Sequence, residues 1–230
     1  MAIKKRPVSP RQKMINLMYV VLMAMLALNV STEVLNGFSI VEESIGRTAA
    51  NASKENQVIY DDFEAQLKAN PAKVKEWFDK AQAVRRMSDS LFNLADELKI
   101  AIVKEADGED GDVKNIEAKD NLEAANQVML APGRGRGGEL YNAINSFRNR
   151  ILAMIDDFAQ KQIISSNLST SIPANAVTMG KNWQEYMFED MPVAGAVTLL
   201  TKLQSDVRYA EGEVLHKLVS NIDLKDIRVN

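Results

Sequence analysis

Apolar residues recur every three or four positions along most of this chain, which is the spacing of one buried face of an α-helix. Four long segments show this pattern: one ending near Lys68, one over residues 74–102, one over residues 140–158 and one over residues 192–222. Strands are not predicted, because no segment alternates apolar and polar residues. The pattern therefore predicts an all-α fold, a helical bundle of four helices in up-and-down order.

Turn-forming residues separate these segments. Asn70-Pro71 interrupts the first two helices, and an acidic, glycine-containing loop, Gly108–Asp112, ends the second. Residues 115–129 are predicted to form a shorter helix. Residues 224–230 are interpreted as the start of a linker or of a further domain, with Asp226–Asn230 beginning an extended segment.

A different pattern precedes the bundle. Met14 to Val30 holds 17 residues without a charge, and only Asn16 and Asn29 among them are strongly polar. Such a helix is about 26 Å long, near the thickness of about 30 Å of a bilayer's hydrocarbon core. We predict a single transmembrane helix over residues 14–34 that continues without interruption into the first helix of the bundle.

The start of this helix is marked by its capping residues. Ser9 is a suitable N-cap, Pro10 suits the first helical position, and Gln12 would complete a capping box. Arg11 then lies in the first turn, at the edge of the membrane.

Charge gives the predicted helix an orientation. Residues 1–32 contain five basic residues and no acidic one, although the whole chain has a net charge of only −3. The positive-inside rule puts residues 1–13 in the cytoplasm and residues 35–223 in the periplasm, as a single-pass protein of the inner membrane. A cleaved signal peptide is disfavoured by the length of the apolar run and the lack of an Ala-x-Ala site. A buried helix of a soluble protein does not explain the one-sided charge.

Four residues of this segment are candidates for binding partner helices in the membrane: Arg11, Asn16, Tyr19 and Asn29. Polar groups at membrane depth usually face other helices, although an Asn near the interface is also tolerated. A cation at a helix N-terminus opposes the helix dipole. Two explanations remain open for Arg11: its side chain reaches the lipid interface, or it pairs with a carboxylate of another membrane helix.

The remaining motifs do not favour an enzyme. The chain has no cysteine and one histidine, His216, so thiolate chemistry and cysteine metal sites are excluded. Gly133–Gly138 matches a dinucleotide-binding pattern, but a helix rather than a strand is predicted before it. Gly108–Asp112 is too short for an EF-hand calcium loop. No catalytic residue, cofactor or metal is predicted, and the small net charge gives no reason to expect a nucleic-acid partner.

Short segments of the sequence also carry a family resemblance: SPRQKMINLMY at 9–19, MAMLALNVS at 23–31, Glu33-Val34, Leu200–Val207 and Glu211–Asn230. The segments before residue 38 resemble the start of the GldM/PorM family, the inner-membrane motor subunits of type IX secretion and gliding motility. The last two segments resemble the end of that family's first periplasmic domain.

The resemblance implies a homodimer whose anchor helices stand within a ring of GldL/PorL membrane subunits. It implies that this assembly uses the proton motive force and transmits torque to periplasmic GldK and GldN (PorK and PorN). It also implies that Arg11 pairs with a membrane glutamate of GldL, and that further β-rich domains follow Asn230.

Two other functions compete with this one. A membrane-anchored periplasmic sensory receptor would have a similar helical domain, but it would need a second spanning helix, which residues 193–230 do not contain. A nicotinamide-dependent enzyme would have to use Gly133–Gly138, and we expect no binding of that cofactor.

Overall fold

The computed structural model describes residues 9–28 and 30–229, with side chains described for residues 9–20 and 30–223. Its elements are all helical. In chain order they are α1 (Pro10–Leu28), α2 (Thr32–Ala69), α3 (Pro71–Asp107), α4 (Glu123–Ala125), the π-helix η1 (Asn126–Leu130), α5 (Gly137–Leu152), α6 (Phe158–Asn167), α7 (Ala174–Thr178), α8 (Trp183–Phe188) and α9 (Val193–Val229). The all-α prediction is confirmed.

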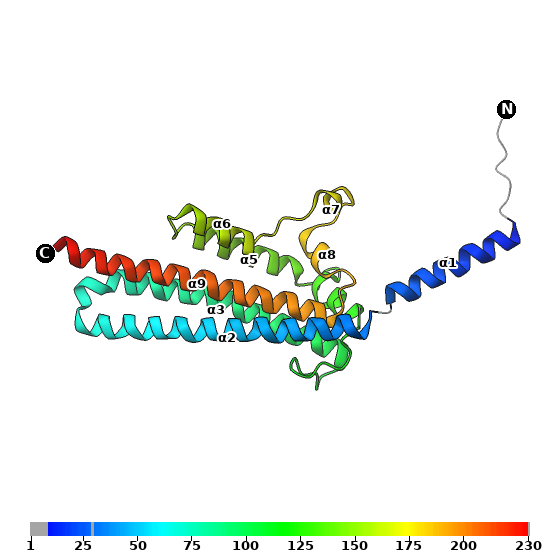
Figure 1. Ribbon diagram of the computed structural model, residues 1–230, viewed down its shortest axis with the longest axis horizontal. Coiled ribbons are helices and arrows are strands. Elements are labelled where there is room, and N and C mark those ends of the chain that lie inside the picture. The colour runs from blue at the N-terminus through cyan, green and yellow to red at the C-terminus, as the bar shows by residue number, and fades with distance from the viewer. Residues whose placement is uncertain (1–8, 29, 230) are drawn as a thin grey trace, which may run out of the picture.

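Three long helices, α2, α3 and α9, form the body of the molecule (Figure 1). A single residue, Asn70, joins α2 to α3, and its side chain accepts a hydrogen bond from the backbone N–H of Lys73. Pro71 occupies the first turn of α3, where its missing N–H costs nothing. The predicted interruption between the first two long helices at Asn70-Pro71 is therefore confirmed.

Helix α9 lies against both α2 and α3 along most of its length (Figure 1). Thr198 bonds to the carbonyl of Phe38, and Glu211 further along α9 bonds to Tyr60 further along α2. These contacts advance together in sequence, so α9 runs parallel to α2 and antiparallel to α3.

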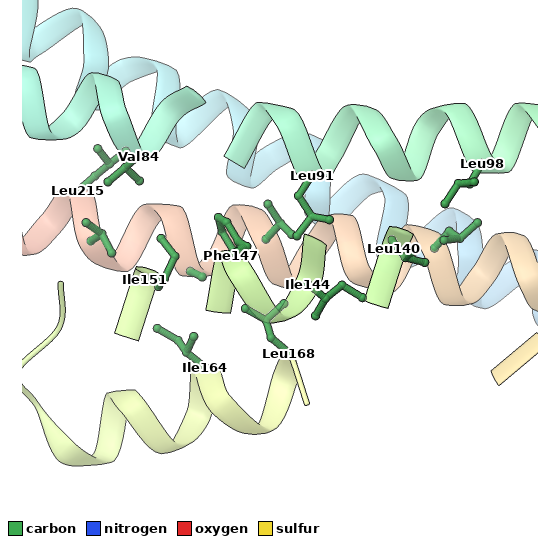
Figure 2. Packing of buried hydrophobic residues seen from close by; sticks show 14 of the residues in the cluster. Val84, Leu91, Leu98, Leu140, Ile144, Phe147, Ile151, Ile164, Leu168 and Leu215 are labelled. Carbon is green, nitrogen blue, oxygen red and sulfur yellow. The ribbon is translucent and has the colours of Figure 1, made fainter. Parts of the chain in front are cut away.

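A shorter layer packs on the outside of α3 and α9. It consists mainly of α5, and Figure 2 shows Leu91 and Leu98 of α3 on the side that faces Leu140, Ile144 and Phe147 of α5. All five side chains are buried. Because both helices present apolar residues at three- and four-residue spacing, they bury a continuous strip of side chains between them.

The predicted up-and-down order is wrong for the last helix. In that order α9 would run antiparallel to α5, yet both helices run in the direction of α2 (Figure 1). The reason is the segment between α5 and α9, which carries the chain back to the end of the bundle where α2 begins. There the N–H groups of Val193 and Ala194 donate to the carbonyls of Asn121 and Lys119, which satisfies the first turn of α9.

The predicted helix boundaries need three corrections. The third long helix does not reach Phe158: α5 ends at Leu152, and Asp157 caps a separate helix, α6, by accepting from the N–H of Gln160. Of residues 115–129, only those from Glu123 onward are helical. The residues after Asp226 were expected to be extended, but α9 continues to Val229.

The predicted continuous helix from the N-terminal segment into the bundle is also wrong. Val30 and Ser31 are not helical, and Ser31 has an extended backbone with φ −65° and ψ 146°. Its hydroxyl accepts a hydrogen bond from the N–H of Val34 at 3.2 Å and so caps α2. Serine favours this role because its short side chain reaches the free N–H groups of a helix start.

Helix α1 extends beyond the end of the bundle where α2 begins (Figure 1). Over the residues that the structure describes, no helix is both long enough and apolar enough to cross a membrane.

Candidate functional site

The predicted partner-binding residues lie on α1. Ser9 accepts a hydrogen bond from the N–H of Gln12, as its predicted capping role requires. The Gln12 side chain does not complete the capping box; it donates instead to Oδ1 of Asn16 at 3.0 Å. At about 100° per residue, Gln12, Asn16 and Tyr19 share one face of α1, and Arg11 lies about 80° away from Tyr19. Arg11, Asn16 and Tyr19 are all exposed, and Asn29 lies outside the described residues.

Most of the other side chains that the structure describes on this helix are apolar, and these are exposed too. Met14, Leu17, Met18 and Val20 expose between 63% and 68% of their surface. They point in several directions around the helix, so α1 is apolar on more than one face. A helix of this kind needs an apolar environment or partner helices around it.

A second group of polar residues is hidden inside the bundle. Helix α9 carries a polar stripe at three- and four-residue spacing, defined by Thr198, Thr201, Gln204, Arg208 and Glu211. Thr201, Gln204 and Glu211 are no more than 2% exposed. Because an unpaired buried polar group is costly, each of these side chains needs a partner on a neighbouring helix.

Glu211 has its partners on α2. Its two carboxylate oxygens accept hydrogen bonds from Nδ2 of Asn56 at 3.0 Å and from the hydroxyl of Tyr60 at 2.7 Å. Arg208, one turn earlier on α9, donates to the same carboxylate at 3.2 Å. The close approach of the two helices depends on Gly212, since a Cβ at that position would meet Oδ1 of Asn56 at 2.8 Å.

Arg208 extends this network to α3. Its guanidinium donates to Oγ of Ser88 and to a carboxylate oxygen of Asp89, both at 2.8 Å, and to Oγ of Ser53 on α2 at 3.0 Å. It also lies over the ring of Phe92, 4.1 Å from the ring centroid. One side chain therefore links all three long helices.

A similar arrangement lies nearer the start of α9. The ammonium group of Lys99 on α3 donates to Oε1 of Gln204 at 2.6 Å and to the hydroxyl of Thr201 at 3.2 Å. Thr201 in turn donates to Glu42 on α2, and the Gln204 amide donates to Asp96 on α3. This second cluster again joins α2, α3 and α9.

The electrostatics of the Glu211 cluster affect Tyr60. Burial, reinforced by the neighbouring Glu211 carboxylate, raises the pKa of Tyr60 far above its ordinary value of about 10. Both causes disfavour the phenolate, so the hydroxyl keeps its proton and remains a donor to Glu211.

The network is suited to positioning helices rather than to catalysis. Its carboxylate, amide, hydroxyl and guanidinium groups are engaged with one another across helix interfaces. His216, the one histidine, is exposed on α9. Among the described residues, no group of three or more acidic or histidine side chains is close enough to hold a metal ion.

The loop at Gly133–Gly138, which matches the dinucleotide-binding pattern, also has a structural role. A helix, η1, precedes it, which excludes the strand that a dinucleotide site would require. A Cβ at Gly135 would lie only 2.6 Å from the carbonyl oxygen of Met129, so the turn needs glycine there. Arg136 bonds to Glu139 and Glu97, and these contacts raise the pKa of Arg136 and lower that of Glu139.

Sequence reasoning missed the polar stripe of α9. The prediction for this helix considered only its apolar positions. The available signal was that polar residues on α9 keep a strict helical spacing of their own, from Thr198 to Glu211. The spacing does not show that a neighbouring helix covers them.

Comparison with known protein families gives a match for most of the chain. No curated protein matches the sequence. The family model described as the GldM N-terminal domain matches residues 33–221, which is more than half of the chain and covers the helical body from α2 to near the end of α9. The chain therefore belongs to the GldM family.

Proposed function

We propose that this chain is a subunit of a proton-driven inner-membrane motor, and that its helical body transmits torque to a gliding and type IX secretion apparatus. Membership of the GldM family supports involvement in that machinery, in a structural rather than an enzymatic role. The observation that carries the proposal is the family match over residues 33–221, directly following an apolar helix that the described part of the chain leaves exposed.

In this proposal α1 stands in the inner membrane, with residues 1–13 in the cytoplasm and the body in the periplasm. The uncharged run from Met14 to Val30 and the five basic residues before it support this topology. Arg11, Asn16, Tyr19 and Asn29 would contact a second copy of the chain and a ring of GldL/PorL-like helices. Components such as GldK and GldN (PorK and PorN) would be reached through regions beyond Asn230.

The body has the mechanical properties that a torque-transmitting element needs. Its three long helices contain 38, 37 and 37 residues, which corresponds to a rod about 56 Å long. The two polar clusters fix the helices against one another at Glu211 and at Lys99. Directional hydrogen bonds resist sliding, because a shift of one turn would leave several buried groups without partners.

The connection between the proposed anchor and the body differs from a rigid shaft. Motion of α1 would pass to α2 through the non-helical residues Val30 and Ser31. A short extended link transmits pulling and rotation of the backbone, but it bends more easily than a continuous helix. We therefore propose that this link allows the body to tilt relative to the membrane helix.

The test is the replacement Arg11→Ala, with Lys13→Ala as a matched control that also removes one cation from the first turns of α1. We expect Arg11→Ala to be produced and inserted at normal levels, while gliding and type IX secretion stop. Lys13→Ala should retain both activities.

Co-purification in detergent gives a second readout of the same proposal. Residues 1–40 should bring down a multi-helix membrane subunit from the wild-type strain. Normal gliding by a correctly inserted Arg11→Ala protein would refute the role assigned to Arg11, and the absence of any membrane partner would refute the motor assembly.

A further inference from the structure

A groove of about 740 Å³ lies between α3 and α5, on the opposite side of α3 from the α2–α9 contacts described above. Apolar side chains line its floor, among them Met87, Leu91 and Leu94 from α3 and Phe147 from α5. Leu91 and Phe147 belong to the buried cluster drawn in Figure 2, and Met87 and Leu94 are half-buried above it. The groove therefore has a preformed apolar base.

The two ends of the groove differ in charge and in whether their charged groups are paired. At one end Glu97 on α3 and Glu139 on α5 are joined by Arg136, which bonds to both carboxylates at 3.2 Å and 2.9 Å. At the other end Arg86 on α3 and Arg150 on α5 line the same groove and are both exposed. Across the residues that the structure describes, neither guanidinium has a hydrogen bond or an ion pair.

The antiparallel packing of α3 and α5 brings the two arginines to the same level. In two antiparallel helices, residues at the same level have numbers that add to a constant value. Leu91 and Phe147 face one another in Figure 2, and the numbers of Arg86 and Arg150 add to nearly the same value as theirs. Two cations on facing helices repel each other, whereas the two glutamates at the other end have a shared counterion. The arginine end of the groove is therefore positively charged and suited to an anionic group.

We infer that the α3–α5 groove is a docking site for an acidic, amphipathic peptide segment of another protein. A carboxylate of that segment would bridge Arg86 and Arg150, because a guanidinium forms paired hydrogen bonds with a carboxylate. Its apolar residues would cover Met87 and Leu94. The apolar floor distinguishes this ligand from a free inorganic anion, which would gain nothing from those side chains.

The position of the groove argues against a lipid headgroup as its ligand. Arg85, next to Arg86, bonds to Gln57 on α2 at 2.7 Å, so the arginine end is level with Gln57. Gln57 is 25 residues from Thr32, the first residue of α2, a distance of about 38 Å along the helix. In the proposed topology, on which this step rests, the site is far from the bilayer and accessible to a periplasmic protein.

The binding test uses the full chain in detergent and a fluorescein-labelled helical peptide of about four turns. The peptide carries leucines along one face and a pair of glutamates at one end of that face. Fluorescence anisotropy should show saturable binding that weakens as salt is added. The double variant R86E/R150E should bind at least about tenfold more weakly, since two charge-assisted contacts become repulsive.

The matched control is K54E/R134E, which makes the same change in net charge at exposed positions outside the groove. It should bind the peptide as the wild type does. A milder pair, R86Q/R150Q, removes the cations without introducing repulsion and should bind with intermediate affinity. Circular dichroism should show unchanged helix content in all three variants, because the substituted side chains are exposed.

Competition assays identify the chemical class of the ligand. The peptide with glutamine in place of glutamate should not compete, and neither should inorganic phosphate or short-chain phosphatidylglycerol at similar concentrations. Equal binding of R86E/R150E and the control would overturn the proposal, as would displacement by the lipid or the phosphate, or no binding at all. These outcomes leave the motor proposal intact, because that proposal depends on Arg11 and α1.

Discussion

The α2–α9 interface and the α3–α5 interface bury side chains of opposite character. Between α2 and α9, Asn56, Tyr60 and Glu211 form hydrogen bonds with defined partners. Between α3 and α5, residues such as Leu98 and Leu140 contribute only apolar surface (Figure 2). Apolar burial is non-directional, while hydrogen bonds accept few alternative arrangements. We therefore expect the first interface to set how the helices align and the second mainly to add stability.

The difference matters for a body that would carry force. Apolar contacts have no preferred direction, so an apolar interface resists a small shift less sharply than one held by hydrogen bonds. The Glu211 cluster would lose three hydrogen bonds between α2 and α9 in the same movement: Asn56 to Glu211, Tyr60 to Glu211 and Arg208 to Ser53. Helix α2 follows α1 across the non-helical residues Val30 and Ser31. The hydrogen-bonded interface holds this helix against α9.

The largest effect is expected from Glu211→Ala. Removing this carboxylate leaves Arg208, Asn56 and Tyr60 without their buried acceptor, which should lower the free energy of unfolding by about 3–5 kcal/mol. Denaturation by guanidinium, followed by circular dichroism, measures the change. Glu213→Ala, on the same helix, is the control and should change stability by less than about 0.5 kcal/mol. A comparable loss from both variants would contradict a special role for Glu211.

Leu98→Ala tests the apolar interface and should cost about 3 kcal/mol. Leu98 is fully buried, so truncation removes apolar contacts and leaves a cavity. Ile100→Ala is its control, because Ile100 is 46% exposed and loses far less buried surface. The same denaturation experiment applies, and equal effects of the two substitutions would show that the α3–α5 layer collapses around the cavity.

Tyr60→Phe should produce a smaller, pH-dependent effect of about 1–1.5 kcal/mol near neutral pH. The pKa of Tyr60 is raised in the folded protein, so above pH 10 the unfolded chain loses this proton while the folded chain retains it. The contribution of Tyr60 is therefore present below pH 10 and is lost as the pH rises further. Unfolding measured from pH 8 to pH 11 should decline less steeply for Tyr60→Phe than for the wild type; parallel curves would contradict this.

Ser31→Ala tests the link between α1 and α2 and should cost about 1 kcal/mol. It removes the side-chain acceptor for the N–H of Val34 and so weakens the start of α2. Ser31→Asp restores an acceptor and should recover the stability. Gliding speed measured in both strains would show whether the capped break has a mechanical role, and equal speeds would restrict it to a structural one.

The smallest change in stability is expected from the joint replacement of Asn56 by Leu, Tyr60 by Phe and Glu211 by Leu. Replacing interacting polar groups together with apolar ones is often close to neutral, unlike the removal of one member. Arg208 keeps its hydrogen bonds to Ser53, Ser88 and Asp89 in this variant. If directional bonds set the alignment of α2 on α9, spin-label distances between the two helices should broaden in this variant. Unchanged narrow distances would show that apolar packing alone fixes the alignment.

Much of the fold follows from local sequence. Asn70 and Pro71 mark the end of one helix and the start of the next, and in the structure α2 ends and α3 begins at these two residues. The apolar spacing on α3 and α9 predicts their lengths well, because a long helix repeats the same signal many times. The boundary at Leu152 was missed, since the apolar period continues through Met154 and Ile155 while the cap at Asp157 starts another helix.

The predicted site residues on α1 are a different case. Helical geometry places Asn16 and Tyr19 on one face of α1. Gln12 shares that face and bonds to Asn16, but it was not among the predicted partner-binding residues. Contacts with membrane partners lie outside a single chain, so the assignment of Arg11 remains a prediction. The polar stripe of α9 was not identified because its burial depends on two helices distant in sequence.

By itself, the sequence determined where helices form, which of their faces are apolar, and that an uncharged segment with a basic N-terminal flank precedes the body. These properties depend on neighbours within a few residues, through hydrogen bonding, capping and side-chain spacing. Only the tertiary structure decided that α9 runs parallel to α2, that Glu211 is enclosed, and that Arg86 and Arg150 share a groove. Such features arise when segments far apart in the chain are packed together, and local patterns carry no information about which segments will meet.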